Sequence, residues 1–153
     1  SVKFNANGGS GSMKKQTGFK YGKSKALSKN TFKAPKGKVF AGWATKKNGK
    51  PVYTNGQKVK NLTSKNGKTV TLYAVWVKAK TYKVKYNANG GKLHKDTKKS
   101  YKTGSGLTLK SPTKKGYKFV GWYTDKSCKK EKVTAIKPWE TGNMVLYAKW
   151  KKA

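Results

Sequence analysis

The chain has 153 residues, of which 38 are lysine, none is arginine and only 4 are acidic, so its formal net charge is +34. High charge with only 34% hydrophobic residues is typical of disordered chains, but an aromatic content of 12% indicates small aromatic cores under a lysine-rich surface. One cysteine and one histidine exclude an internal disulfide, a thiolate cluster and a histidine-rich zinc site. The longest apolar run, residues 72–77, is far shorter than the ~20 residues of a membrane span.

Three sequence segments recur in the same order along the chain. They read FNANGG and YNANGG at residues 4–9 and 86–91, GKVFAGW and GYKFVGW at 37–43 and 116–122, and LYAVW and LYAKW at 72–76 and 146–150. Such a repeat predicts two tandem modules, 1–78 and 81–153, joined by the short linker Lys78-Ala79-Lys80. The first 80 residues contain no carboxylate side chain, so we expect no enzyme and no cofactor.

The expected elements of each module are short strands separated by turns. Side chains alternate at 2–5 and 82–86, which predicts a first strand, and the Asn-Gly-Gly that follows suits a hairpin turn. Alternation also predicts strands at 17–21 and, more weakly, at 98–102. Ser24 to Thr31 is predicted to form one short helix with Ser24 as its N-cap. In each module a proline, Pro35 or Pro112, ends the element that precedes it. The two segments that end in Gly-Trp form the third strand.

The fourth strand, at 69–77 and 144–150, indicates which face of the sheet is buried. Leu72, Ala74 and Trp76 share one face, and their counterparts Leu146, Ala148 and Trp150 do the same. The opposite face has Val75 in one module and Lys149 in the other. Because that position tolerates a charge, we assign the Leu-Ala-Trp face to the core.

The repeated segments resemble a known family. FNANGG, Tyr21-Gly22, VFAGW and LYAVW in the first module, and YNANGG, the run from Pro112 to Tyr123 and LYAKW in the second, resemble the Listeria–Bacteroides repeat, also called the internalin B-repeat. The resemblance covers nearly the whole chain twice. It implies an α+β, mainly β, fold of two tandem β-grasp-like modules, with no catalytic residues to carry over.

The resemblance also implies a location. Such modules serve as stalk, adhesion or wall-contact repeats in secreted or wall-attached proteins of Gram-positive bacteria, so we expect an extracellular or cell-wall protein. No signal peptide stands at Ser1 and no sorting motif at Ala153, so we expect the chain to be a fragment of a longer protein. We expect the tandem modules to be monomeric.

Three tryptophans are candidates for exposed stacking platforms. Trp43 and Trp122 share strand parity with Val39 and Lys118, a position that varies between apolar and charged, although a small module also needs large side chains for its core. Trp139 has no counterpart in the first module and lies in a loop-like Lys-Pro-Trp-Glu segment. Trp139 is therefore the tryptophan we most expect to be exposed.

Lysine pairs are the candidate binding residues. The candidates are Lys14, Lys15, Lys46, Lys47, Lys98, Lys99, Lys114, Lys115, Lys118, Lys129 and Lys130. A single pair is usually a solvated turn, but a net charge of +34 repels itself unless a polyanion or counter-ions relieve it. Lysine without arginine suits point-charge neutralisation of phosphate or sulfate and argues against base-specific readout.

The sequence leaves three functions open. The first is binding of anionic polymers, with wall teichoic acid, glycosaminoglycan or extracellular nucleic acid as partners. The second is a structural spacer whose lysines only maintain solubility, although a spacer would be equally soluble with charges of both signs. The third is a protein that binds DNA or RNA independently of sequence.

Overall fold

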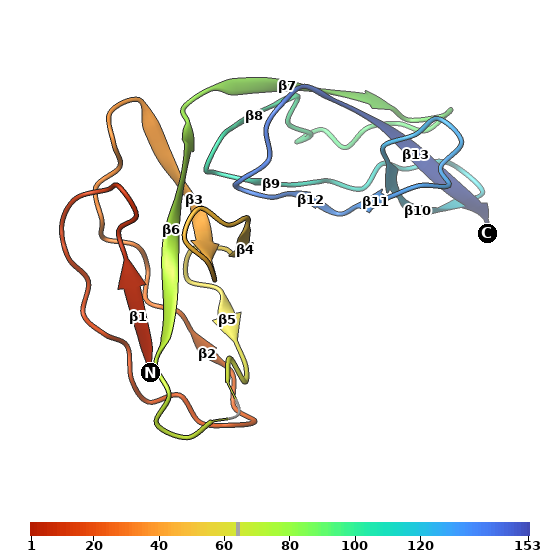
Figure 1. Ribbon diagram of the computed structural model, residues 1–153. Coiled ribbons are helices and arrows are strands. Elements are labelled where there is room, and N and C mark those ends of the chain that lie inside the picture. The colour runs from red at the N-terminus through yellow and green to blue at the C-terminus, as the bar shows by residue number, and fades with distance from the viewer. Residues whose placement is uncertain (64) are drawn as a thin grey trace. The chain divides into compact units, whose positions relative to one another are not determined.

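The computed structural model describes residues 1–63 and 65–153, and in them the chain is built from strands, turns and loops without a helix. It divides into two compact units, unit 1 from Ser1 to Ala79 and unit 2 from Lys80 to Ala153 (Figure 1). The α+β class and the β-grasp-like architecture expected from the sequence are therefore wrong. Each unit is an all-β module.

Unit 1 contains a four-stranded sheet and a small two-stranded sheet. The larger sheet has the order β1-β6-β3-β4 and the smaller one pairs β2 with β5. The strands are β1 (Val2–Asn5), β2 (Lys25–Ala26), β3 (Lys38–Ala44), β4 (Pro51–Tyr53), β5 (Lys58–Val59) and β6 (Val70–Lys78).

Unit 2 repeats this plan with one more strand. Its larger sheet has the order β11-β10-β13-β7-β8, and β12 pairs with β9 in the smaller one. The strands are β7 (Thr81–Asn87), β8 (Ser100–Lys102), β9 (Leu107–Thr108), β10 (Tyr117–Tyr123), β11 (Lys132–Val133), β12 (Ala135–Ile136) and β13 (Met144–Lys152). The predicted third and fourth strands are thus confirmed in both units.

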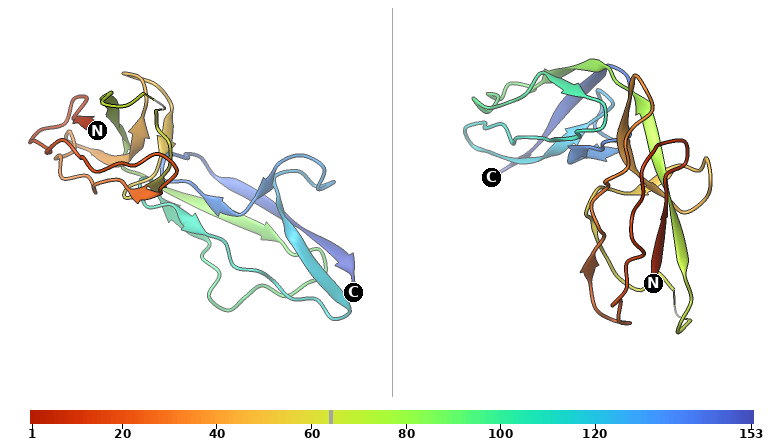
Figure 2. Two further views of the ribbon diagram at one scale, coloured as in Figure 1. Left: turned by 90° about the horizontal axis from the view of Figure 1, so that it is seen from below. Right: turned by 90° about the vertical axis from the view of Figure 1, so that its left-hand side faces the viewer.

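In each unit the first strand is parallel to the last. β1 pairs with β6 and β7 with β13, and the left view of Figure 2 shows the green β7 and the blue β13 running in the same direction. The Asn-Gly-Gly turn after the first strand is attached to the last one by side-chain hydrogen bonds. The Asn7 amide donates to the Ala74 carbonyl at 3.0 Å, and the Trp76 indole donates to the Ala6 carbonyl at 2.8 Å.

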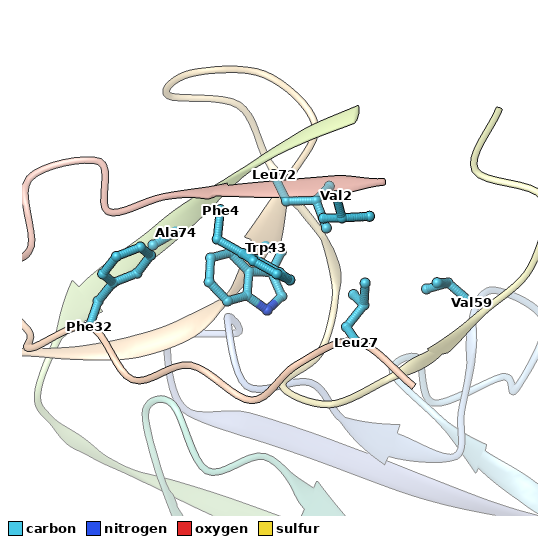
Figure 3. Close-up of a cluster of buried hydrophobic side chains, with 8 residues drawn as sticks. All are labelled: Val2, Phe4, Leu27, Phe32, Trp43, Val59, Leu72 and Ala74. Carbon is cyan, nitrogen blue, oxygen red and sulfur yellow. The ribbon is translucent and has the colours of Figure 1, made fainter. Parts of the chain in front are cut away.

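The core of unit 1 lies between its larger sheet and the segments that carry β2 and β5. Figure 3 shows Trp43 between side chains of β1 and β6 on one side and those of Phe32, Leu27 and Val59 on the other. Leu72 and Ala74 are fully buried and Trp76 packs against them, which confirms the predicted core face. In unit 2, Trp122 and Leu146 occupy the corresponding core.

A β-bulge interrupts the third strand of both units at the same place. The pairing shifts between Phe40 and Gly42 in β3 and between Phe119 and Gly121 in β10. Because a bulge adds one residue, side-chain alternation changes phase there. Phe40 and Trp43 therefore lie on the same face, with ring centroids 4.9 Å apart.

The predicted helix from Ser24 to Thr31 is wrong, because this segment is extended and contains β2. Its backbone donors bind distant acceptors: the Leu27 amide donates to the Gln57 carbonyl at 2.9 Å, and the Ser28 amide donates to the Gln16 side chain at 2.8 Å. Leu27 is the segment's only large apolar residue, and its side chain is buried. A helix there would have had no apolar stripe to pack.

The strand predicted at 17–21 is also wrong, whereas its weaker counterpart at 98–102 forms β8. β8 pairs with Thr81, Tyr82 and Lys83, and of these only Lys83 has a counterpart in unit 1, which is Ser1. Unit 1 keeps a single bridge in this region, between Val2 and Gln16.

Candidate polyanion interface

The lysine pairs predicted as binding residues lie in five separate loops. Lys14-Lys15 lie between β1 and β2, Lys46-Lys47 between β3 and β4, Lys98-Lys99 before β8, Lys114-Lys115 before β10, and Lys129-Lys130 between β10 and β11. All of these side chains are exposed except that of Lys114, which is partly buried. The loops therefore present charge to solvent in both units.

Lys114 is part of the packing of unit 2. Its ammonium donates to the Asn89 carbonyl at 3.1 Å and lies 4.3 Å from the ring centroid of Tyr117 and 5.9 Å from that of Trp150. These contacts hold the Asn-Gly-Gly turn against the strand that follows Lys114. The side chain is thus less available to a polymer than its neighbour Lys115.

The strand register gathers a different set of lysines on one face of the larger sheet of unit 2. Lys118 in β10 lies opposite Lys151 in β13, Gly121 lies opposite Lys149, and Val145 lies opposite Lys85 in β7. These positions alternate with Leu146, Ala148 and Trp150, which point into the core, so they lie on the outer side of the sheet.

Lys132 in β11 completes this surface. It lies opposite Tyr123, and a Cβ built on Gly121 would meet its side chain, so the Lys132 stem crosses the sheet over that glycine. We call this surface the outer face of unit 2. It consists of Lys85, Lys118, Lys132, Lys149 and Lys151 together with Tyr123, Tyr147 and the exposed Val145.

The outer face holds no carboxylate at its strand positions. The acids nearest to it in sequence are Glu131, directly before Lys132, and Asp125, two residues after Tyr123, and Asp125 is engaged within its own loop. The Asp125 carboxylate accepts hydrogen bonds from the Ser127 hydroxyl at 2.6 Å and from the Lys129 and Lys130 amides at 3.0 Å. These hydrogen bonds lower the pKa of Asp125 to about 2, and the bond from Ser127 contributes most.

The same face of unit 1 has valines where unit 2 has Lys118, Lys149 and Lys151, although Lys3 stands at the position of Lys85. Val39 lies opposite Val77 where unit 2 has Lys118 and Lys151, and Val75 stands where unit 2 has Lys149. The two repeats therefore share a register but present different chemistry on their outer faces. The group formed by Lys118, Lys149 and Lys151 belongs to unit 2 alone.

Sequence reasoning found one lysine of the outer face, Lys118, and missed the others. The missed residues are Lys85, Lys132, Lys149 and Lys151. The signal for Lys149 and Lys151 is present in the sequence, because they alternate with Ala148 and Trp150 in a strand whose core face is known. The adjacent lysine pairs lie in loops outside this face, and they stay a prediction.

Of the two alternatives that the sequence leaves for Trp43 and Trp122, the core position is confirmed and the exposed stacking platform is wrong. Trp43 is 0% exposed and Trp122 is 2% exposed, because the bulge in the third strand turns both indoles to the face of Phe40 and Phe119 rather than that of Val39 and Lys118. Trp139, predicted to be the most exposed tryptophan, is partly buried. Trp43 and Trp122 therefore form no open stacking platform.

The remaining reactive side chains do not form a chemical site. Cys128 is buried, with its Sγ 3.7 Å from the Ala148 carbonyl oxygen, and burial raises its thiol pKa. His94 accepts a hydrogen bond from the Asp96 amide through Nδ1 at 3.0 Å. Across residues 1–63 and 65–153, no three histidine, cysteine or acidic side chains come together as metal ligands. That part of the chain also has no helix long and apolar enough to cross a membrane.

Comparison with known proteins gives the family. Over 119 residues the chain is 35% identical to a "Putative Gly-rich membrane protein" of Evansella cellulosilytica, and over 86 residues it is 37% identical to a "Putative membrane protein" of the same organism. These matches cover 74% and 53% of the chain but only 12% of each relative, so the chain spans a small part of their length. No solved structure matches the chain.

A family model matches the chain twice, at residues 1–75 and 82–149, and this confirms the resemblance seen in the sequence. The family is typically non-catalytic, and each of the two matches covers one repeat of this chain. The chain belongs to the Listeria–Bacteroides repeat domain family of bacterial surface repeats, of which it carries two copies.

Proposed function

We propose that the two repeats form a non-enzymatic part of a bacterial cell-surface or secreted protein and bind anionic polymers through lysine charge. Wall teichoic acid, glycosaminoglycan and extracellular nucleic acid are the candidate polymers. The family and the membrane-protein names of its relatives support a surface location.

The observation that carries this proposal is the outer face of unit 2. Placing Lys118 directly opposite Lys151, beside Lys149, sets like charges against one another, which destabilises a sheet. The equivalent valines of unit 1 show that the fold accepts uncharged residues at these positions. These lysines lower the stability of the sheet and the fold does not require them. Such a combination is expected of residues that serve binding.

The proposal is tested by a salt titration of the full chain with heparin, duplex DNA and teichoic acid. Binding through charge makes log K fall linearly with log salt, with a slope of about 0.9 per phosphate contact for duplex DNA. Replacing Lys118, Lys149 and Lys151 by Gln should lower that slope by about 2–3 contacts. The matched control replaces Lys14, Lys46 and Lys47 by Gln, which removes the same charge from loops of unit 1 and should change the slope less.

Two results would contradict the proposal. If none of the three polymers binds near physiological salt, the repeats are spacers whose lysines only keep them soluble. If the outer-face and loop variants lower the slope equally, net charge alone attracts the polymer and the outer face is not the contact surface.

A further inference from the structure

Two tyrosines lie side by side among the lysines of the outer face. Tyr123 in β10 is registered directly opposite Tyr147 in β13, so their Cβ atoms lie about 4.5–5.5 Å apart. Both side chains are partly exposed, and the Lys149 ammonium lies 5.5 Å from the ring centroid of Tyr123. The face thus combines adjacent aromatic rings with a cationic border.

The fold does not use the hydroxyl groups of these two tyrosines. Elsewhere in unit 2 the Tyr86 hydroxyl donates to the Lys98 carbonyl at 2.7 Å, and the Tyr101 hydroxyl donates to the Gly142 carbonyl. Among the described residues, the hydroxyls of Tyr123 and Tyr147 make no hydrogen bond to the protein. The core of unit 2 is formed on the other side of the sheet and needs neither ring.

We propose that the outer face of unit 2 binds single-stranded nucleic acid, with bases stacked on Tyr123 and Tyr147 and phosphates held by the surrounding lysines. This inference rests on the proposed polyanion binding and names its ligand class. Exposed sheet faces that carry aromatic rings stack unpaired bases, and the stacking tolerates any sequence because every base has a π-face.

The arrangement favours a single strand over the other polyanions. In a duplex the bases are already stacked and paired, so a flat sheet meets only phosphates and gains nothing from the tyrosines. Heparin and teichoic acid carry no base, so they would use the lysines alone. The absence of arginine leaves no bidentate contact to guanine, and binding should not depend on base sequence.

The test measures binding of the full chain to fluorescein-labelled dT15, to a 15-base-pair duplex and to heparin, by anisotropy at fixed salt. Replacing Tyr123 and Tyr147 together by Thr, which suits strands, should weaken dT15 binding about tenfold or more. Duplex and heparin binding should stay within about twofold, because the lysines remain. Replacing both by Phe keeps the rings and should preserve dT15 binding.

The matched control is Tyr73→Thr, which removes the tyrosine at the position of Tyr147 in unit 1, where Ala44 and Asn5 lie opposite it and Val75 stands in place of Lys149. It should leave dT15 binding unchanged. In the unaltered chain, NMR amide shifts on adding dT15 should be largest at residues 118–123 and 145–151. This readout needs no substitution, so it stays decisive if the Thr variant melts early.

Any of five outcomes would overturn the inference. The Thr variant could weaken dT15 and duplex binding equally, or weaken neither. It could weaken heparin binding as strongly as dT15 binding, which would assign the rings to sugars. The unaltered chain could bind heparin but not dT15, which would leave the proposed polyanion binding in place, whereas no binding of any probe would overturn both.

Discussion

Gly91 shows how one residue ties the repeated turn to the last strand. Any Cβ at this position would overlap the Trp150 indole and would stand 3.0 Å from the Thr113 carbonyl oxygen. The indole must pass this closely because its Nε1 donates to the Ala88 carbonyl at 2.8 Å. Gly9 and Trp76 repeat the arrangement in unit 1, which explains why the turn and the final Trp recur together in the sequence.

Replacing Gly91 by Ala should therefore destabilise unit 2 by about 1–3 kcal/mol, the usual cost of overpacking a tight site. Urea denaturation followed by tryptophan fluorescence measures this loss. Combining Gly91→Ala with Trp150→Phe should cost less than the sum of the single changes, because the smaller ring makes room. Strict additivity of the two changes would show that the overlap is not the cause.

Glu140 is a carboxyl group that the fold disfavours in its charged form. Its Oε2 is buried without a hydrogen-bond partner, and burial raises the pKa of Glu140, while the Lys137 amide and charge act the other way. A raised pKa in the folded state contributes stability below the ordinary glutamate pKa, and that contribution is lost as pH rises through the folded value.

Glu140→Gln should remove this loss. As pH rises from the ordinary glutamate pKa through the raised pKa of the folded state, the melting temperature of the unaltered chain should fall relative to that of the variant. Asp125 acts in the opposite direction and at lower pH, because its pKa is lowered to about 2. Its contribution is lost only as pH falls below the ordinary aspartate range, so Asp125→Asn is the control. A parallel pH profile for the unaltered chain and Glu140→Gln would contradict this account.

At the scale of elements, Gln16 fixes the segment that was predicted to be helical. Its side chain donates to the Ala26 carbonyl and accepts from the Ser28 amide, both at 2.8 Å, while its backbone bridges Val2. One side chain thus satisfies the backbone groups on both sides of Leu27. The sequence pattern could not show this, because Gln16 lies ten residues before Ala26.

Gln16→Ala should destabilise unit 1 by about 1–2 kcal/mol, because it leaves the partly buried Ser28 amide without its acceptor and removes the exposed hydrogen bond to the Ala26 carbonyl. Amide exchange at Ser28 should speed up more than exchange in β6. Lys14→Ala is the matched control, since Lys14 is exposed on the same loop and should change neither quantity. Unchanged protection of Ser28 would mean that other contacts hold the extended segment.

The strands show which features of the fold could be predicted from the sequence and which could not. Hydrophobic alternation located the third and fourth strands and the Leu72–Ala74 core face, because both are local patterns. It misplaced Trp43 and Trp122, since a bulge of one residue reverses the parity beyond it and leaves no mark in the pattern. The cationic face needed the pairing of β10 with β13, which is a long-range fact that neighbouring lysine pairs do not reveal.

For the whole molecule, self-repulsion opposes the compact state in both units. Unit 1 has 18 lysines and no carboxylate side chain, and unit 2 has 20 lysines against 4 acids. Each unit offsets this repulsion with a core of fewer than a dozen fully buried side chains. Stability should therefore depend on anions in solution.

Sodium sulfate should raise the melting temperature more than sodium chloride at equal ionic strength. Both salts screen the lysines, but sulfate also strengthens apolar burial and can bind between neighbouring ammonium groups. About 1 kcal/mol of added stability corresponds to a rise of about 4–8 °C for a unit of this size.

The outer-face variant Lys118→Gln, Lys149→Gln, Lys151→Gln separates these effects. It should melt at a higher temperature than the unaltered chain in low salt, because the opposed like charges are gone. The sulfate excess, which is the rise in melting temperature in sulfate beyond that in chloride, should be smaller for this variant. The loop variant Lys14→Gln, Lys46→Gln, Lys47→Gln loses the same charge and should keep most of the sulfate excess in its melting temperature. Calorimetry in matched salts measures both. An equal sulfate excess in the two variants would show that sulfate acts only through screening and apolar burial, and that the lysines of the outer face hold no anion.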